Sequence, residues 1–286
     1  MPSATPWSKP NTHSRPIAII GAGTMGRRIA MMWLAAGYNV ILCEKQTSNH
    51  EPALRYIKSN VEQQAAKLGT KPGTGRFTTS MEEAVEGAWM VIEAVPEIIE
   101  MKIDIIGQLD RLAPADCIIA TNSSSLRSSQ MLVNTKRNYR ICNGHYYMPP
   151  EQLYFELMSC GETDPEIFPF LMEKAAAAGF KPVHAKSEST GLVFNRIWAG
   201  IKRECLSVLS EGITNAATID EMFKSWFQAN KGPCHMMDTV GLDTVYNIET
   251  VYARELHTDP RPKDWLKTTY VDKGNLGAKT GKGLLG

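Results

Sequence analysis

The chain has 286 residues, close to the size of about 250–300 residues at which single hydrophobic cores give way to two domains. Its formal net charge is +1, and its contents of 43% hydrophobic and 21% charged residues are ordinary for a globular protein. The near-neutral charge excludes a broad basic surface, and no run reaches the ~20 apolar residues of a membrane span, so we expect neither nucleic acid nor a membrane as a partner.

The N-terminal segment and the cysteines bear on cellular location. Pro2, Pro6 and Pro10 lie among Ser, Thr and Asn without an apolar segment, which argues against a secretory signal. The prolines would also break the amphipathic helix of a transit peptide, so we expect a disordered tail over residues 1–15. The six cysteines are widely spaced and form no C-x-x-C pair, which predicts reduced core residues, a cytoplasmic protein and no metal site.

Residues 16–44 carry the pattern around which the rest of the chain is organised. Ile17 to Ile20 is a continuous apolar run, typical of a strand buried on both faces of a parallel sheet. It leads into Gly21, Gly23 and Gly26, which fit G-x-G-x-x-G and precede an apolar helix. The first glycine allows a tight turn, the second lets backbone amides approach a pyrophosphate, and the third lets helix and strand pack closely. This pattern predicts dinucleotide binding, against the plainer alternative of a strand–turn–helix without a ligand.

The end of the second strand indicates which dinucleotide is bound. The apolar strand from Tyr38 to Cys43 ends in Glu44, whose carboxylate can accept hydrogen bonds from both adenosine ribose hydroxyls and would repel a 2′-phosphate. The helix N-terminus behind the glycines offers free N–H groups and a positive dipole end to the phosphates. We therefore predict NAD as the cofactor. The predicted binding residues of this segment are Gly21, Gly23, Thr24, Met25, Gly26 and Glu44.

Strand and helix patterns then alternate as far as the middle of the chain. Ser80 precedes a short helix with Glu83 at the capping-box position. The alternation specifies a doubly wound parallel sheet. The predicted helices span 52–68, 81–86 and 98–112, and the predicted strands span 76–79, 89–95 and 117–121.

The pattern changes near residue 190. Before it, strands are predicted at 139–147, 153–158 and 181–185, with a helix at 165–178; after it, only helical patterns follow, near 192–209, 219–229 and 243–256. We therefore expect an α/β Rossmann-type domain over residues 16–187 and an all-helical C-terminal domain over residues 188–286. Residues 277–283 look like a phosphate loop but do not fit the G-x-x-x-x-G-K-[ST] spacing, so we expect a structured tail.

Several ordered motifs together resemble the L-3-hydroxyacyl-CoA dehydrogenase family. The resemblance covers about residues 16–283 and implies an NAD-dependent dehydrogenase acting on a CH–OH group. The motifs are Gly21-Ala-Gly-Thr-Met-Gly26, Glu93-Ala-Val-Pro-Glu97 with Lys102, Thr121-Asn-Ser-Ser-Ser-Leu126, Gly144-His-Tyr-Tyr-Met-Pro149 with Phe155-Glu156, Gly191-Leu-Val-Phe-Asn-Arg196, Asp238-Thr-Val-Gly-Leu-Asp243 and Lys279-Thr-Gly-Lys-Gly283.

Residue by residue, the resemblance implies His145 as the general acid/base and Glu156 as the carboxylate that orients it. Hydride transfer from a secondary alcohol needs a base for the hydroxyl proton, and histidine titrates near neutrality. The resemblance also places Ser124 and Asn195 on the reacting oxygen. It assigns Glu97, Lys102 and Asn122 to the cofactor.

Each of these residues also has a structural interpretation. His145 alone would be an ordinary core or surface histidine, Glu156 a solvent-facing strand residue, and Ser124 a helix cap. Asn195 is polar on a helix, where an inward-facing side chain needs a partner. Their occurrence together favours catalysis over the competing class, a non-catalytic NAD-binding protein.

Two departures from the family pattern concern the substrate. The usual His-Phe-Phe-Asn-Pro is His145-Tyr-Tyr-Met-Pro149, and the spacing from His145 to Glu156 is one residue shorter. After Leu68 most of the second arm of a helical hairpin that embraces CoA is missing. We expect interconversion of a 3-hydroxy and a 3-oxo acyl group, with acetoacetyl-CoA a poor substrate. A small hydroxy acid or a biosynthetic carbonyl compound is the alternative. The resemblance also implies a homodimer through the helical domain.

Overall fold

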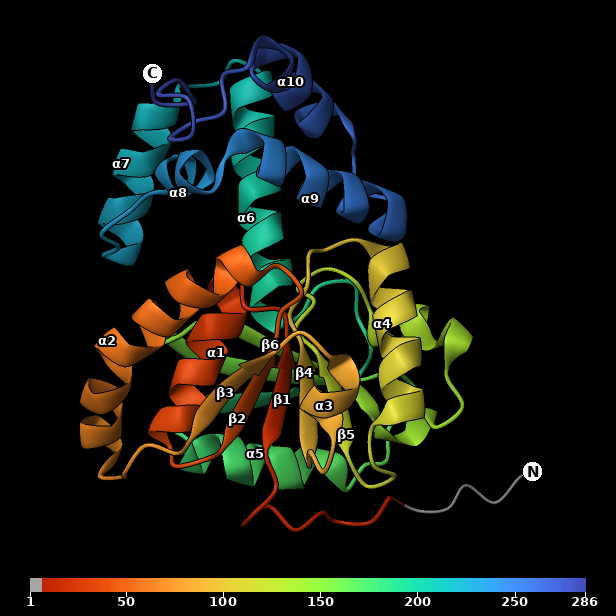
Figure 1. Cartoon of the computed structure of the whole chain (residues 1–286). Coiled ribbons are helices and arrows are strands. Elements are labelled where there is room, and N and C mark those ends of the chain that lie inside the picture. The colour runs from red at the N-terminus through yellow and green to blue at the C-terminus, as the bar shows by residue number, and fades with distance from the viewer. Residues whose placement is uncertain (1–6) are drawn as a thin grey trace. The chain divides into compact units, whose positions relative to one another are not determined.

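An eight-stranded sheet with the strand order β3-β2-β1-β4-β5-β6-β7-β8 organises the first part of the molecule. The structure, a computed structural model, describes residues 7–286, which divide between Ser189 and Thr190 into two compact units (Figure 1). β1 to β6 pair in parallel, β7 is antiparallel to β6, and β8 is parallel to β7. The strands are β1 (Ile17–Ile20), β2 (Val40–Cys43), β3 (Gly75–Thr78), β4 (Met90–Glu93), β5 (Ile118–Thr121), β6 (Ile141–Met148), β7 (Gln152–Ser159) and β8 (Lys181–Ala185).

The order 3-2-1-4-5-6 is that of the dinucleotide-binding Rossmann fold, so the predicted fold class is confirmed. β1, β2, β4 and β5 are buried along their whole length, because helices cover both faces of the sheet. Their near-continuous apolar composition is what burial on two faces requires.

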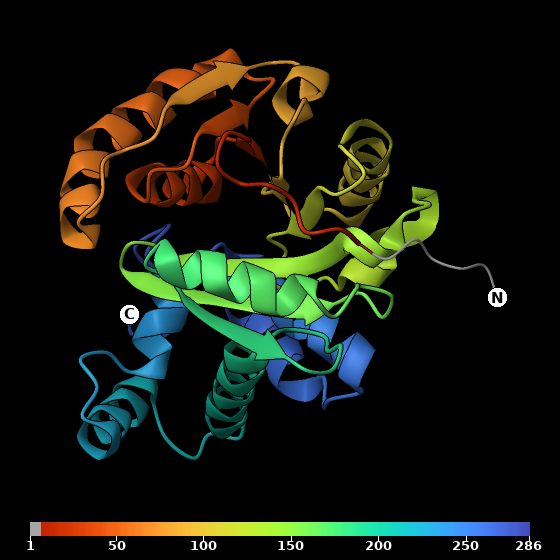
Figure 2. The same ribbon diagram turned by 90° about the horizontal axis from the view of Figure 1, so that it is seen from below.

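Two hydrophobic layers hold the helices to the sheet. One face packs against α1 (Thr24–Ala35), α2 (His50–Leu68) and α5 (Ile167–Ala177), and the other against α3 (Met81–Val85), α4 (Ile99–Leu112) and the 3-10 helix η2 (Ser128–Asn134) (Figures 1 and 2). On the first face Trp33 and Trp89 are fully buried and meet edge to face with ring centroids 6.1 Å apart. The shorter 3-10 helices of this unit are η1 (Thr47–Asn49) and η3 (Asn138–Arg140).

The segment after β2 has the shape that the sequence predicts. α2 ends at Gly69, which adopts the left-handed conformation with φ +69°, and the chain enters β3 at Gly75. A single α-helix, preceded by the 3-10 helix η1 (Thr47–Asn49), therefore connects β2 to β3. α3 likewise begins as predicted, because the side chain of Ser80 accepts a hydrogen bond from the backbone N–H of Glu83.

The prediction of a disordered tail is wrong for residues 7–15, while residues 1–6 lie outside the described residues. Trp7 is only 8% exposed; its backbone N–H donates to Asp164 at 3.1 Å and its indole N–H donates to the carbonyl of Asp116 at 2.9 Å. Arg15 also donates to the Asp116 carboxylate at 2.9 Å. One buried indole and one ion pair thus attach a segment whose proline content predicted disorder.

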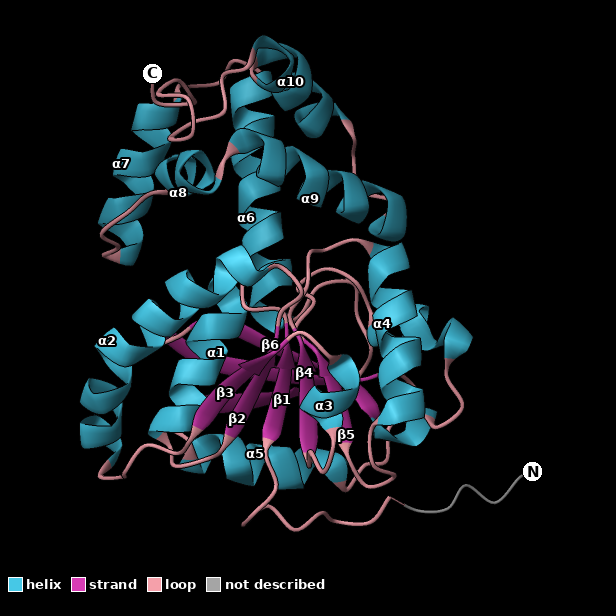
Figure 3. Cartoon of the chain, viewed as in Figure 1, coloured by secondary structure: helices cyan, strands magenta, loops and turns pink. Residues whose placement is uncertain are grey.

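The second unit contains helices and loops, with one isolated β-bridge between Gly277 and Lys282 (Figure 3). Its core includes Leu206, Met237, Leu242 and Leu266. The helices are α6 (Val193–Ser210), α7 (Ala216–Phe227), α8 (Pro233–Val240), α9 (Leu242–Leu256), α10 (Arg261–Thr269) and the 3-10 helix η4 (Val271–Lys273).

The end of the chain is attached to this unit. The Asp238 carboxylate accepts hydrogen bonds from the backbone N–H groups of Leu284 and Leu285 at 2.9 and 3.1 Å. Lys279 forms an ion pair with Asp243 at 2.8 Å. The two late motifs of the sequence therefore contact each other, and the tail is structured as predicted. Across residues 7–286, no helix has the length and apolar character needed to cross a membrane.

Candidate active site

The glycine loop between β1 and α1 contains two glycines that the fold requires and one that it does not require. Gly21 has φ +101°, and a Cβ there would lie 2.8 Å from the carbonyl oxygen of Ala94. A Cβ on Gly26 would overlap the carbonyl oxygen of Gly21. A Cβ on Gly23, in contrast, would meet no atom within 4 Å. The space above Gly23 is therefore open, as a pyrophosphate cradle must be.

The first turn of α1 is also available to an anion. Gly23 is the N-cap, so no side chain caps the helix, and the first turn holds no acidic residue. The unsatisfied N–H groups and the positive end of the dipole, at Thr24 and Met25, thus remain for phosphate. These residues fit a bound dinucleotide.

Glu44 lies where the ribose prediction requires it, next to the glycine loop. One carboxylate oxygen accepts from the backbone N–H of Ala22 at 3.0 Å, and the other accepts from that of Gln46 at 2.9 Å. Both bonds use N–H donors of the backbone and hold the half-buried carboxylate at the end of β2. Its role toward the adenosine ribose stays a prediction.

A cavity of about 250 Å³ lies within the first unit, at the carboxyl ends of β4 and β5 and beside β6. In open parallel sheets this edge is where ligands bind. The amide oxygen of Asn122 accepts from the backbone N–H of Tyr146 at 2.8 Å and so joins the end of β5 to β6. Six of the predicted site residues line the cavity: Met25, Glu97, Lys102, Asn122, Ser124 and His145.

His145 is the titratable group best suited to proton transfer in this cavity. It lies on β6 beyond the last residue paired with β5 and is only 7% exposed. Burial lowers the pKa of His145 to about 4, although the negative charge of Glu97 acts in the opposite direction. The imidazole is therefore neutral at pH 7. Its Nδ1 is buried without a hydrogen-bond partner among the described residues.

Glu156 faces His145 across the antiparallel pair of β6 and β7. The two residues are partners in register, and Glu156 is 3% exposed. The Glu156 carboxylate accepts a hydrogen bond from the hydroxyl of Tyr147 at 2.9 Å. The Tyr147 ring packs edge to face on the His145 ring with centroids 4.7 Å apart. The structure thus adds Tyr147, which also lines the cavity, to the predicted pair.

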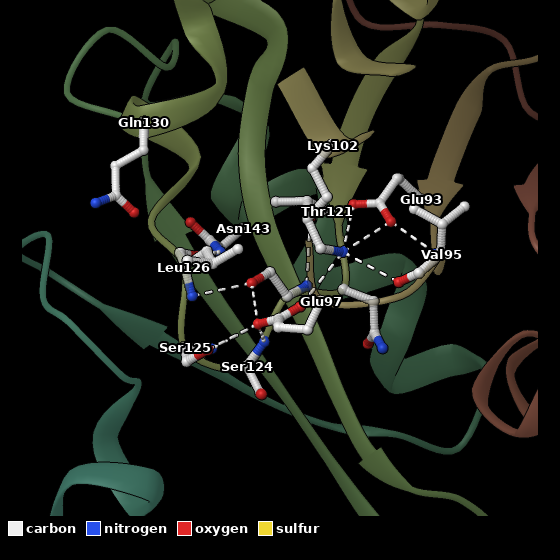
Figure 4. A network of polar contacts seen from close by, with 12 residues as sticks. Glu93, Val95, Glu97, Lys102, Thr121, Ser124, Ser125, Leu126, Gln130 and Asn143 are labelled. Atoms are coloured by element: carbon white, nitrogen blue, oxygen red, sulfur yellow. Dashed lines mark hydrogen bonds and ion pairs between the residues drawn. The ribbon is translucent and has the colours of Figure 1, made fainter. Parts of the chain in front are cut away.

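Lys102 is held by buried protein acceptors. It is 1% exposed, and its Nζ donates to the two carboxylate oxygens of Glu93 at 2.8 and 3.0 Å and to the carbonyl of Val95 at 3.3 Å. It also forms an ion pair with Glu97 at 3.4 Å (Figure 4). The ammonium therefore fixes the loop after β4, and its contact with a cofactor stays a prediction.

Glu97 in turn fixes the loop after β5. One of its carboxylate oxygens accepts from the Ser123 hydroxyl at 2.5 Å and from the backbone N–H groups of Ser124 and Ser125, each at 3.1 Å. Burial opposes ionisation, but the charge of Lys102 and the serine hydrogen bonds hold the pKa of Glu97 below its ordinary value. Ser124 is positioned at the cavity through this carboxylate.

Sequence reasoning did not assign roles to Glu93, Ser123, Ser125 and Tyr147. The one available signal was Glu93, an acidic residue at the end of an otherwise apolar strand, where a buried carboxylate needs a cation. Asn195 lies on α6 in the second unit, and its contact with the reacting oxygen stays a prediction.

Together, the Rossmann sheet, the open glycine loop and the cavity with a buried neutral histidine define a dinucleotide-dependent oxidoreductase. Residues 16–188 match the 3-hydroxyacyl-CoA dehydrogenase, NAD binding domain, and residues 191–285 match the 3-hydroxyacyl-CoA dehydrogenase, C-terminal domain. The chain therefore belongs to the 3-hydroxyacyl-CoA dehydrogenase family. The predictions of NAD as cofactor and of an NAD-dependent dehydrogenase are confirmed.

Relatives of this chain carry related names. A probable 3-hydroxybutyryl-CoA dehydrogenase from Bacillus subtilis is 30% identical over 277 residues, which are 94% of this chain and 96% of that protein. The 3-hydroxyacyl-CoA dehydrogenase-like protein LAM1 of Cochliobolus heterostrophus is 47% identical over 146 residues, which are 50% of this chain but only 31% of LAM1. The solved structure of a diketoreductase, described as acting on dicarbonyl compounds, is 30% identical with a TM-score of 0.79 and covers 94% of this chain and 98% of that chain.

Proposed function

We propose that the protein interconverts a 3-hydroxy and a 3-oxo group next to an acyl function, with His145 as the general acid/base. The observation that carries this proposal is the buried, neutral His145 in the same cavity as Ser124, at the sheet edge that also holds the glycine loop. When bound, NAD supplies the hydride acceptor. In the oxidative direction neutral His145 takes the hydroxyl proton as the hydride leaves C3.

In the reductive direction protonated His145 returns a proton to the alkoxide oxygen. Ser124 is held by Glu97 and donates to that oxygen, with Asn195 as the second donor in this proposal. Glu156 stabilises the imidazolium from the facing strand. Gly21, Gly23, Thr24, Met25, Gly26 and Glu44 bind the adenosine and pyrophosphate portion, and Glu97, Lys102 and Asn122 lie toward the nicotinamide portion.

The test is His145→Gln. We expect this variant to bind NADH with the affinity of the wild-type protein and to lose turnover by roughly 10²–10⁴-fold, the usual span for a lost general acid/base. NADH binding is measured by fluorescence and turnover by NADH oxidation. Undiminished turnover would remove His145 from the mechanism. A protein that binds NADH but turns over none of the 3-oxo probes in either form would favour the non-catalytic alternative.

The acyl group is the finer part of the proposal. Because α2 is followed directly by β3, the helical hairpin that would embrace CoA lacks its second arm. We therefore propose that acetoacetyl-CoA is a poor substrate with a high KM, since remote binding energy is lost. The full-length match to a diketoreductase supports the alternative of a small substrate without CoA. NADH oxidation with acetoacetyl-CoA, acetoacetate and ethyl acetoacetate in parallel decides between them; a KM of about 1–10 μM for the CoA ester would refute the argument.

Assembly and location complete the proposal. We propose a homodimer formed through the helical unit. On α7, Met222, Trp226 and Phe227 are 56%, 81% and 70% exposed, and such apolar exposure supports an interface. A monomeric mass across micromolar concentrations would contradict the dimer. The six cysteines are free thiols and five of them are buried, which supports a reducing, cytoplasmic location.

A further inference from the structure

The hydrogen bond between Tyr147 and Glu156 lies directly beside His145. Tyr147 is two residues from His145 on β6, and its ring packs edge to face on the His145 ring, so both side chains stand on one face of the sheet. Glu156 projects from β7 on the same face, opposite His145. In such antiparallel pairs the Cβ atoms are about 4.5–5.5 Å apart. The carboxylate is therefore within side-chain reach of both the Tyr147 hydroxyl and the His145 ring.

We propose that Tyr147 is a positioning residue that competes with His145 for the Glu156 carboxylate. Its hydroxyl holds the carboxylate while the imidazole is neutral, and the carboxylate transfers to Nδ1 of His145 when the imidazole is protonated. The inference rests on the proposed function, in which His145 alternates between these two forms. In it, Tyr147 sets how strongly the protein favours the neutral form.

The buried Nδ1 atom supports this exchange. Nδ1 of His145 has no partner among the described residues, while the Glu156 oxygen bonded to Tyr147 lies on the facing strand. A neutral imidazole with an unpaired nitrogen lacks one hydrogen bond. An imidazolium carries two N–H donors and a buried charge, and leaving that charge unpaired costs much more free energy. Protonation therefore provides the driving force that moves the carboxylate from a neutral hydroxyl to a charged donor.

The charged groups that line the His145 cavity or lie near Tyr154 are not altered by a Tyr147→Phe substitution. Glu97, after β4, and Lys102, on α4, line the same cavity as His145 and are bonded to each other. On β8, Lys181 lies 5.6 Å from the centre of the Tyr154 ring. Replacing the Tyr147 hydroxyl leaves these groups in place. Tyr147→Phe keeps the ring that packs on His145 and removes the hydroxyl that donates to Glu156.

The test is Tyr147→Phe, with Tyr154→Phe as the matched control. Tyr154 is on β7, is 47% exposed, and its ring lies 6.5 Å from that of Tyr147. The His145 ring is titrated by NMR in the full chain without cofactor or substrate, and its signal is assigned with His145→Gln. We expect Tyr147→Phe to raise the titration midpoint of His145 by about 1 pH unit or more, because the hydroxyl that competes with the imidazolium for the carboxylate is removed. Tyr154→Phe leaves the midpoint unchanged.

A second comparison separates this role from a merely structural one. In a Glu156→Gln background, Tyr147→Phe is expected to have no effect on the His145 midpoint, since the charge that the hydroxyl held is gone. An unchanged or lowered midpoint in Tyr147→Phe alone, or an equal rise in both backgrounds, overturns the proposal. If Tyr147→Phe does not fold, Glu156→Gln alone decides: the proposal requires a lower midpoint than in the wild-type protein, and an unchanged midpoint rejects it.

Turnover provides the corresponding kinetic signature. Reduction requires protonated His145, so kcat/KM for ethyl acetoacetate with NADH falls as pH rises through the His145 midpoint. In Tyr147→Phe, the pH at which kcat/KM falls should rise by the same number of pH units as the His145 midpoint in the NMR titration. Wild-type turnover in His145→Gln would refute the proposed function but not the titration result, so the failure of one is distinguishable from the failure of the other.

Discussion

The glycine loop gives a sharp test because its glycines are required for different reasons. Gly23→Ala places a methyl group in open space, whereas Gly26→Ala places one on the carbonyl oxygen of Gly21. Gly23 has φ −62°, which alanine adopts without strain. We expect Gly23→Ala to fold with a free energy of unfolding within about 1 kcal/mol of the wild-type value, the cost of alanine at the N-cap of α1. Its methyl group should nevertheless raise the Kd for NADH at least tenfold, or about 1.4 kcal/mol, by keeping the pyrophosphate from the backbone amides.

Gly26→Ala should instead reduce the stability of the fold. Overpacking costs about 1–3 kcal/mol and more when the obstacle is backbone, while the higher helix propensity of alanine returns about 1 kcal/mol. The net loss is about 2 kcal/mol, which lowers Tm by roughly 4–8 °C in a chain of this size. Urea unfolding and NADH fluorescence titration of both variants check the pair. Wild-type NADH affinity in Gly23→Ala would refute the assignment of the open space to the pyrophosphate.

The remaining predictions concern the cofactor, the buried ion pair and His145. Glu44→Ala should lower the ratio of the NADPH Kd to the NADH Kd at least tenfold, because a ribose acceptor and a repulsive charge are both removed. If fluorescence titrations give the same ratio for the variant and the wild-type protein, Glu44 does not select NAD. Lys102→Met leaves the buried Glu93 carboxylate without its cation, although the Val95 N–H and the Thr121 hydroxyl still donate to it. Urea unfolding should show a loss of about 3–5 kcal/mol that a second change, Glu93→Gln, partly restores. The pKa of His145 is about 4 in the folded protein against an ordinary 6.5, so the unfolded chain takes up the proton first as pH falls. The free energy of unfolding of the wild-type protein should therefore fall by about 3 kcal/mol more between pH 7 and pH 4 than that of His145→Gln. Parallel pH dependences of the two unfolding free energies would contradict a buried neutral His145.

The parts of the fold that depend on local pattern were predictable from the sequence. Continuous apolar runs separated by helical periods specified the parallel strands, and Ser80 specified the start of α3. The attachment of Trp7 was not predictable, because its partners at Asp116 and Asp164 are distant in the chain. A proline-rich composition describes the intrinsic preference of a segment, and one buried side chain at the right place overrides it.

The candidate site was predictable as a set of residues but not as a set of bonds. Motifs predicted Glu97, Lys102, Ser124 and His145 as site residues, and all four line one cavity at the carboxyl edge of the sheet. The partners of each charge depend on side-chain geometry that no motif spacing encodes. For example, no motif spacing shows that Lys102 donates its two short hydrogen bonds to the buried carboxylate of Glu93.

The change of strand direction after β6 explains why the site needs a hairpin at this position. The parallel pairing of β5 with β6 ends at Thr121 and Asn143, yet β6 continues to Met148 and carries His145 past the ends of the other strands. If the strand after β6 were parallel to it, only the carboxyl-terminal end of that strand would lie at this edge. The antiparallel β7 instead returns from it directly and sets Glu156 opposite His145 on the same face. A buried histidine and a buried carboxylate are thus brought opposite each other by the pairing of β6 with β7, and the bond from the Tyr147 hydroxyl to Glu156 lies beside them.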